Sequence, residues 1–256
     1  MIKDLLLGFR RWELWSRLAW NQIRAKYRRS AIGPLWATLN FAIFVGALGI
    51  LYAELFGQDP KIYIPHLVLG LLIWNLLSQV MLEGCSLFSD VRTYIDEANL
   101  PLPVFVFGMM WRNLILFAFS FLIFILVAIL VPLVPDLFWL LSLVGFVLVA
   151  LNALWLGLLL AIVSARFHDL VEIVGSMLRI IFFITPILWL PGMEGRLTFL
   201  LGANPFYHLI EICRSYIVGS GAPIGSWVIV LVITITGWLV TAIMYNKYRY
   251  RIAFWI

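Results

Sequence analysis

Six long apolar stretches, separated by shorter polar segments, dominate the pattern of hydrophobic positions along the chain. Each is close to the roughly 20 mostly apolar residues that a membrane-spanning helix needs. The pattern therefore predicts an all-α, polytopic membrane protein with six transmembrane helices. The fifth stretch contains Arg179 and Pro186, which makes it the least regular of the six. The expected spans are Pro34–Phe56, Tyr63–Leu82, Val104–Val131, Leu137–Ser164, Ile173–Leu190 and Trp227–Tyr245.

The first 33 residues follow a different pattern, with apolar residues at helical spacing on one face and arginines on another. This pattern is typical of a basic amphipathic helix that lies in the lipid headgroup layer. The alternative is that its cations serve only as a topology signal. Gly33-Pro34 ends the helix and divides the chain into residues 1–33 and a transmembrane domain, residues 34–256. The apolar face consists of Leu5, Phe9, Trp12, Ala19 and Ile23.

Two of the connecting segments carry patterns of their own. The loop over 84–103 contains a short amphipathic stretch, Ser86–Ala98, which we expect to form a helix along the membrane surface. Such a helix suits the docking of a cytoplasmic partner, and an ordinary solvated connector is the alternative. The segment over 191–226 is too long for a simple loop and too apolar for a solvated one. Its middle, Phe206–Val218, is expected to be a helix that re-enters the outer leaflet, where irregular backbone must be covered by protein.

Composition supports a membrane protein, and the distribution of charge predicts its orientation. Hydrophobic residues make up 64% of the chain and charged residues 12%, which is too little charge to cover the surface of a soluble domain. The lysines and arginines concentrate in the first 33 residues and in the tail after the sixth span. An even number of spans places both termini on one side, and the positive-inside rule makes that side cytoplasmic. Because this charge follows topology, we expect no nucleic-acid partner.

Residue types that carry enzymatic chemistry are sparse and scattered. His66, His168 and His208 lack the spacing of a metal site, and Cys85 and Cys213 belong to no paired-cysteine motif. The chain also lacks a glycine-rich phosphate-binding loop. We therefore expect no catalytic residue, no metal site and no cofactor on this chain. No line of acidic residues crosses the predicted bilayer, which disfavours an ion-coupled transporter.

Aromatic residues make up 16% of the chain, and many of them lie well inside the predicted spans. Aromatic faces stack on the apolar faces of sugar rings, so an aromatic-lined route would suit the passage of a glycan. Ordinary packing against core and lipid is the alternative, and it is the better interpretation for most of these residues. The aromatic residues in question are Phe41, Phe44, Trp74, Phe117, Phe119, Phe121, Phe124, Trp155, Phe182 and Phe183.

Four motifs occur in a fixed order among the spans. They are RAKYRRSAIGPLW (Arg24–Trp36), ARFHDLVEIV (Ala165–Val174), FFITPILW (Phe182–Trp189) and NPFYHLIEICRSYIVG (Asn204–Gly219). In order and spacing the chain resembles the transmembrane subunit of the type-2 ABC exporters, in the branch that exports polysaccharides such as O-antigen, capsule and teichoic acid. No one of the motifs is diagnostic by itself.

The resemblance implies a role for several segments. The basic helix and the 84–103 loop would be an interface helix and a coupling helix that contact a separate ATPase. The 191–226 segment would supply short gate helices at the outer mouth, and the first and fifth spans would line the channel. The implied residues are Arg24, Arg28, Arg29, Asp90, Arg92, Asp96 and Glu97 for docking; Phe41, Phe44, Trp74, Phe182 and Phe183 for the channel; and Phe206, Tyr207, His208 and Arg214 for the outer gate. Relatives often carry lysines where this chain has Asp96-Glu97, so the partner's surface is expected to differ there.

The function that the resemblance implies is a channel-forming permease of an ATP-driven exporter, which moves lipid-linked polysaccharide across the bacterial inner membrane. Its expected partners are a second copy of the chain, two copies of an ATPase that carries the ATP and magnesium, the lipid-linked glycan and membrane lipids. An exporter of small hydrophobic molecules with the same architecture is the first alternative. A membrane glycosyltransferase and a non-transporting membrane scaffold are the others.

Overall fold

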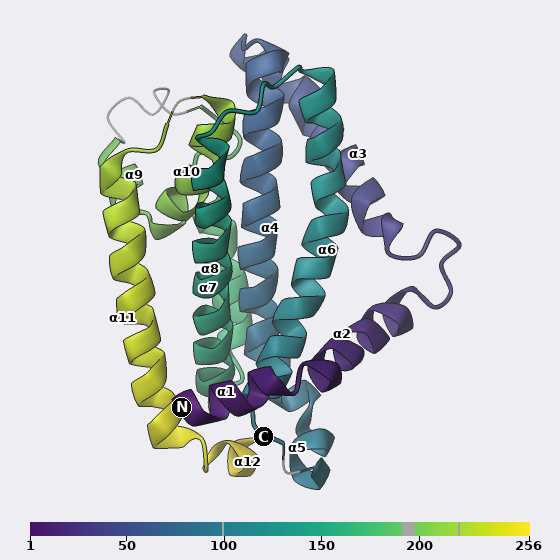
Figure 1. Ribbon diagram of the computed structural model, residues 1–256, viewed down its shortest axis with the longest axis vertical. Coiled ribbons are helices and arrows are strands. Elements are labelled where there is room, and N and C mark those ends of the chain that lie inside the picture. The colour runs from purple at the N-terminus through teal and green to yellow at the C-terminus, as the bar shows by residue number, and fades with distance from the viewer. Residues whose placement is uncertain (99, 191–197, 220) are drawn as a thin grey trace.

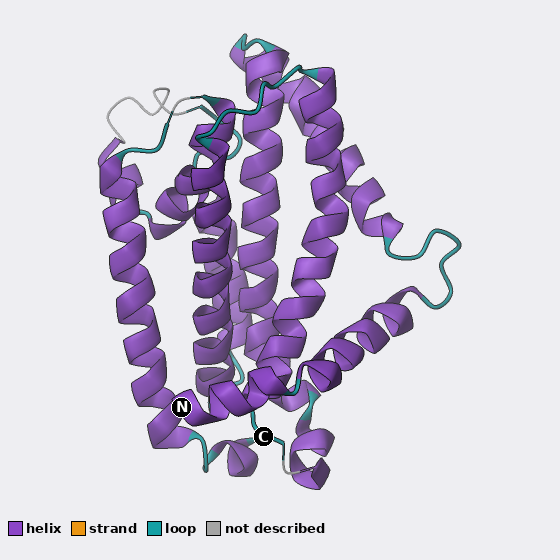
Figure 2. Ribbon diagram, viewed as in Figure 1, coloured by secondary structure: helices purple, strands orange, loops and turns teal. Residues whose placement is uncertain are grey.

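The structure is a computed structural model that describes residues 1–98, 100–190, 198–219 and 221–256 (Figure 1). The described residues form helices joined by short loops, with no β-strand among them (Figure 2). Within these residues, five helices are long and apolar enough to cross a bilayer. These findings confirm the prediction of a polytopic all-α membrane protein. The five helices are α3 (Leu35–Phe56), α4 (Pro60–Asp90), α6 (Pro103–Leu130), α7 (Trp139–Ser164) and α11 (Ile224–Tyr248).

The fifth predicted span differs from the expectation of a full-length helix. Helix α8 (Leu170–Ile184) has 15 residues, which at about 1.5 Å per residue is roughly 22 Å, short of the roughly 30 Å of a hydrocarbon core. It ends at Thr185, whose backbone is extended, because the residue before a proline is disfavoured in helical conformation. The chain continues through Pro186 as a buried, irregular segment.

Helix α4 is the centre of the bundle and packs against α3, α6, α7, α8 and α10 (Figure 1). It begins at Pro60, after an N-cap at Asp59 whose carboxylate accepts a hydrogen bond from the backbone N–H of Lys61 at 2.9 Å. The helix runs eight residues beyond the predicted span, to Asp90. The first part of the predicted Ser86–Ala98 helix therefore belongs to α4, and the rest, α5 (Arg92–Ala98), follows a break at Val91.

The N-terminal segment forms two helices, α1 (Ile2–Arg10) and α2 (Trp12–Tyr27), where the pattern predicted one. Both lie across one end of the bundle and pack against α6 (Figure 1). Ala19 and Ile23 are buried, whereas Phe9 and Trp12 are exposed. The apolar face therefore packs partly against the bundle and is partly exposed. This division suits a helix that lies at a membrane surface.

Both termini lie at the same end of the bundle, close to α1, α5 and α12 (Ile252–Trp255) (Figure 1). The Arg249 guanidinium donates to the Asp4 carboxylate at 2.5 Å, and the Met1 amine donates to the Asn246 side chain at 2.8 Å. The hydrogen bond to Asp4 raises the pKa of Arg249. The first helix is thereby fastened to the end of the last spanning helix.

At the opposite end, α9 (Thr198–Ala203) precedes α10 (Pro205–Val218), so a helix is present where Phe206–Val218 was predicted. The Asn204 side chain caps α10 by accepting from the backbone N–H groups of Phe206 and Tyr207, at 3.0 and 3.4 Å. Helix α10 is largely buried, between α4, α7 and α11. Residues 191–197 and 220 of the predicted outer segment lie outside the described residues.

Candidate coupling and translocation site

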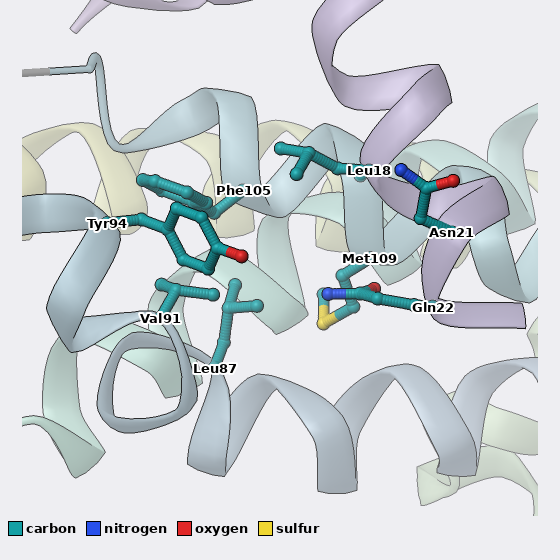
Figure 3. Close-up of a pocket in the computed structure, with 9 residues that line it drawn as sticks. Leu18, Asn21, Gln22, Leu87, Val91, Tyr94, Phe105 and Met109 are labelled. Carbon is teal, nitrogen blue, oxygen red and sulfur yellow. The ribbon is translucent and has the colours of Figure 1, made fainter. Parts of the chain in front are cut away.

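A small cavity lies at the end of the bundle that carries the termini. It has a volume of about 170 Å³ and lies between α2, α6 and the junction of α4 and α5 (Figure 3). Asn21 and Gln22 face it from α2, and Tyr94 faces it from α5. The remaining lining residues are Leu18, Leu87, Val91, Phe105, Gly108 and Met109. Tyr94 of α5 borders this cavity, whereas Ile95 packs against the core, so α5 is held on one side and has free space on the side that faces α2.

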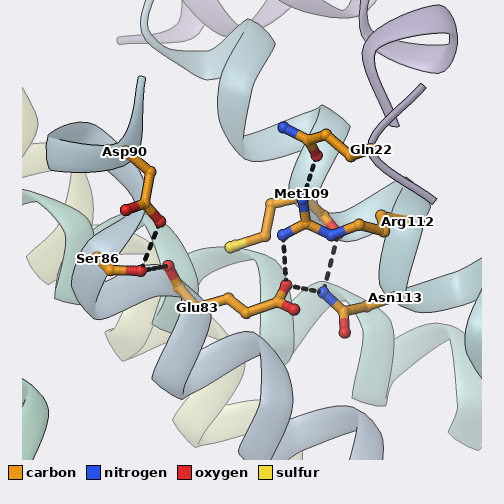
Figure 4. A network of polar contacts seen from close by, with 7 residues as sticks. All are labelled: Gln22, Glu83, Ser86, Asp90, Met109, Arg112 and Asn113. Atoms are coloured by element: carbon orange, nitrogen blue, oxygen red, sulfur yellow. Dashed lines mark hydrogen bonds and ion pairs between the residues drawn. The ribbon is translucent and has the colours of Figure 1, made fainter. Parts of the chain in front are cut away.

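A charged network borders this cavity (Figure 4). The Arg112 guanidinium on α6 donates to the Glu83 carboxylate on α4 at 2.8 Å, and Asn113 donates to the same oxygen at 2.5 Å. Arg112 also donates to the side chain of Gln22 on α2. Charge-assisted hydrogen bonds of this kind are about twice as strong as neutral ones. The network therefore ties α2, α4 and α6 together beside α5.

The predicted docking residues are distributed over this same end. Arg24, Arg28 and Arg29 are exposed on or just after α2. Asp90 is exposed at the end of α4 and accepts a hydrogen bond from Ser86 at 2.8 Å, and Arg92 is exposed at the start of α5. The side chains of the remaining two, Asp96 and Glu97, lie outside the described part of the chain. The prediction that all seven form one docking surface stays a prediction.

Four of the five predicted channel residues surround one open cavity of about 670 Å³ between α3, α4 and α8. Phe44, Trp74, Phe182 and Phe183 all line it. The fifth, Phe41, is buried in the core and is not among the lining residues. We call this space the aromatic cavity. It combines ring faces with polar groups, since Asn75, Ser78, Glu172 and Arg179 also line it.

The residues predicted for the outer gate are buried or half-buried in the single chain, and their role in a gate stays a prediction. Phe206, His208 and Arg214 are buried, and Tyr207 is half-buried with its ring 5.0 Å from that of His208. The Nε2 of His208 lies 3.1 Å from the Gly202 carbonyl, and its Nδ1 lies 2.9 Å from the Ser226 hydroxyl. A carbonyl only accepts, so Nε2 carries a proton and donates to Gly202.

Arg214 is the centre of a buried polar cluster that joins three elements. Its guanidinium donates to Glu211 on the same helix at 2.8 Å, to His66 on α4 at 3.0 Å and to the Pro186 carbonyl after α8 at 2.7 Å. A buried guanidinium is tolerated only when its charge is paired and its donors are satisfied. The cluster therefore holds α10, α4 and the irregular segment after α8 in one arrangement.

Sequence reasoning missed the pairing of these charges. Glu83 and Arg112 lie near the ends of different predicted spans, and only the fold shows that they pair with each other across 29 residues of sequence. The Glu211–Arg214 pair has a local signal, because residues three apart on a helix are neighbours. Among the described residues, no three His, Cys, Asp or Glu side chains gather in a way that could hold a metal ion.

Comparisons with known proteins place this architecture in a family. The family model of the ABC-2 type transporter matches residues 13–218 of the chain. The O-antigen export system permease protein RfbA of Myxococcus xanthus is 26% identical over 202 residues, which cover 78% of this chain and 76% of that protein. The protein of the same name from Klebsiella pneumoniae is 21% identical over 245 residues, which cover 91% of each chain. This chain therefore belongs to the ABC-2 type transporter family, as its resemblance to the type-2 ABC exporters predicted.

Proposed function

We propose that the chain is the permease of an ATP-driven exporter that moves lipid-linked polysaccharide across the bacterial inner membrane. It would act as two copies, together with two copies of a separate ATPase that binds the ATP and magnesium. The family match supports the transport role, and the names of the two relatives support a glycan as the cargo in preference to a small hydrophobic molecule. The chain itself makes and breaks no covalent bond in this proposal.

The proposed orientation places α1, α2, α5 and both termini on the cytoplasmic side. The exposed arginines of α2, Lys247 in the last turn of α11 and the two arginines after α11 belong to this end of the bundle, which agrees with the positive-inside rule (Figure 1). The aromatic rings of α1 and α2 would sit in the headgroup layer. The end that carries α9 and α10 then faces outward.

The continuity of α4 is the observation that carries the coupling mechanism. One unbroken helix bears Asp90 beside α5 at its inner end, Trp74 in its middle and His66 near its outer end. Closure of the ATPase on α5 and α2 would move α4 and α6 together, because the Glu83–Arg112 network ties them. That movement would reach α10 through the His66–Arg214 contact and would open a path past the aromatic cavity.

The experiment that tests the proposal is depletion of the protein in its host, with surface polysaccharide and intracellular lipid-linked glycan measured together. Loss of glycan from the surface with accumulation inside would support export, and expression of the intact chain should restore the surface glycan. Glycan missing from both places would point to synthesis. Unchanged surface glycan would contradict the proposal and would favour a small-molecule cargo.

A further inference from the structure

Helix α4 carries two polar side chains, Asn75 and Gln79, that the coupling mechanism does not use. Between Pro65 and Phe88, only Asn75 and Gln79 are exposed, although the helix is at the centre of the bundle. Glu83 follows at the same spacing of four residues, which places all three on one helix face. They line a cavity of about 300 Å³ between α2, α3, α4 and α6. We call it the amide cavity.

The other walls of the amide cavity repeat the same chemistry. Asn40 contributes a third amide from α3, and Asn113 and Ser120 contribute polar groups from α6. Lys26 and Tyr27, at the end of α2, lie at its cytoplasmic edge. Burial raises the pKa of the Tyr27 hydroxyl, which therefore remains a neutral hydrogen-bond donor. Figure 4 shows Glu83 and Asn113, where the cavity meets the charged network.

The amides lie at a depth where polar groups are costly. Gln79 and Asn75 precede Glu83 on α4 by four and eight residues, which places them about 6 and 12 Å closer to the middle of the membrane. Half of the hydrocarbon core is about 15 Å. Within the described residues, no hydrogen bond partner is found for the side-chain amides of Asn40, Asn75 or Gln79, whereas the amide nitrogen of Asn113 donates to Glu83 and to the Met109 carbonyl. Unpaired amides at such a depth indicate a polar occupant.

The chemistry of the walls selects an uncharged, hydroxyl-rich occupant. A side-chain amide both donates and accepts, which matches a sugar hydroxyl, and the ring of Phe117 offers an apolar surface. The Glu83 carboxylate is already neutralised by Arg112, so it does not select a cation. A volume of about 300 Å³ is at the lower limit of small-molecule pockets, which suits a single sugar ring better than a polymer.

The amide cavity also adjoins the aromatic cavity, because Asn75 lines both. We propose that the amide cavity binds one sugar ring of the membrane-anchored glycan on the cytoplasmic side, before that ring passes Asn75 into the aromatic cavity. This inference rests on the proposed export function. The same chemistry would accept the sugar headgroup of a membrane lipid that is not transported, and the experiment must separate the two sources.

The test compares the intact chain with the double variant Asn75→Leu/Gln79→Leu, purified in a dodecyl polyoxyethylene detergent without sugar. Dodecyl maltoside is the probe, and thermal unfolding is the measurement. We expect the sugar-headed detergent to raise the unfolding temperature of the intact chain in a concentration-dependent manner. The double variant should bind it about tenfold more weakly, because two hydrogen-bonding amides are lost. Without the probe, the variant should be at least as stable as the intact chain, since it removes two unpaired amides.

A matched control is Gln58→Leu, an amide in the outer turn before α4, which should keep the full response to dodecyl maltoside. In cells, the double variant should be produced normally and should lose surface glycan. No sugar-dependent shift in the intact chain would overturn the inference. A shift abolished by the double variant together with unchanged surface glycan would assign the cavity to a bystander lipid and would also overturn it. Failure of the export function itself is a separate result, in which depletion of the whole chain leaves surface glycan unchanged.

Discussion

The ring of Trp74 lies 5.5 Å, centroid to centroid, from the ring of Phe206 and equally far from that of Phe182. Trp74 is on α4, Phe182 near the end of α8 and Phe206 at the start of α10. A residue predicted to line the channel therefore touches one predicted to belong to the outer gate. The three rings form a continuous connection from the aromatic cavity to the buried base of α10.

Replacing Trp74 with alanine should loosen α10. The indole is buried and contacts two other rings, so its removal should cost about 3 kcal/mol of unfolding free energy or more. Because α10 loses its aromatic contact with α4, its amide protons should exchange faster than those of α7. Hydrogen exchange of the purified chain measures this difference. Trp111→Ala, at an exposed position on α6, is the control and should leave α10 protected. Equal protection of α10 in both variants would contradict the connection.

Replacing one residue of the Glu83–Arg112 pair should lower the free energy of unfolding more than replacing both. Arg112→Met leaves the Glu83 carboxylate with Asn113 as its remaining partner and should cost about 1–3 kcal/mol. The double variant Glu83→Gln/Arg112→Met should recover part of this loss, and a double-mutant cycle should give a coupling energy of about 1–2 kcal/mol. Denaturant unfolding of the four proteins measures it. If the losses of unfolding free energy in the two single variants add up to the loss in the double variant, the coupling energy is zero and the pair does not stabilise the fold.

The boundaries of the spanning helices followed from hydropathy, whereas the contacts between them did not. Helices α3, α6, α7 and α11 begin and end within about three residues of the predicted spans, because each apolar run ends in polar or turn-forming residues. Helix α4 was predicted too short, since its last turns are polar while its backbone remains helical. Helix α8 was predicted too long, because Ile187 and Leu188 continue the apolar run beyond the Thr185-Pro186 break.

Only part of the candidate site could be predicted from the sequence. The rings of the aromatic cavity were recognisable because large aromatic residues inside a span are conspicuous. The polar contacts were not, since pairs such as His66–Arg214 lie 148 residues apart and only the fold brings them together. Asn75 and Gln79 were overlooked because the leucines around them hold the average hydropathy of the stretch high.

Gly84→Ala should separate α4 from α7. A methyl group at this position would lie 2.8 Å from the carbonyl oxygen of Gly157 and 3.0 Å from its Cα, and this backbone cannot move aside without shifting a helix. We expect a loss of about 1–3 kcal/mol, even though alanine favours helix more than glycine does. The control is Gly46→Ala on α3, where nothing lies within 4 Å, and it should be neutral or slightly stabilising. If thermal unfolding shows Gly46→Ala to be less stable than Gly84→Ala, the close approach of α4 and α7 at Gly84 and Gly157 would be refuted.

Arg214→Met should be among the most damaging single changes in the chain. It leaves Glu211 buried without its cation and removes the donor to His66 and to the Pro186 carbonyl. Breaking a buried pair by removing one partner costs about 3–5 kcal/mol. Unfolding of the purified variant should show this loss, with the segment after α8 becoming sensitive to protease. Arg17→Met, at an exposed position on α2, should change stability by less than about 0.5 kcal/mol. If Arg214→Met lowers the free energy of unfolding only slightly, the cluster does not hold α8 and α10 together.

Reversing the charge at Asp90 should uncouple the permease from its proposed ATPase without unfolding it. Asp90 is exposed at the end of α4 and accepts a hydrogen bond from the neighbouring Ser86, so Asp90→Lys should leave thermal stability nearly unchanged. If this end docks on the ATPase, the variant should lower transport-linked ATP hydrolysis about tenfold or more, because a like charge or an unpaired charge then faces the partner. The control is Asp136→Lys, in the loop between α6 and α7 at the opposite end of the bundle, which should hydrolyse ATP at the normal rate. Intact transport-linked hydrolysis in Asp90→Lys would show that Asp90 takes no part in coupling, and the docking surface would then have to centre on the arginines of α2.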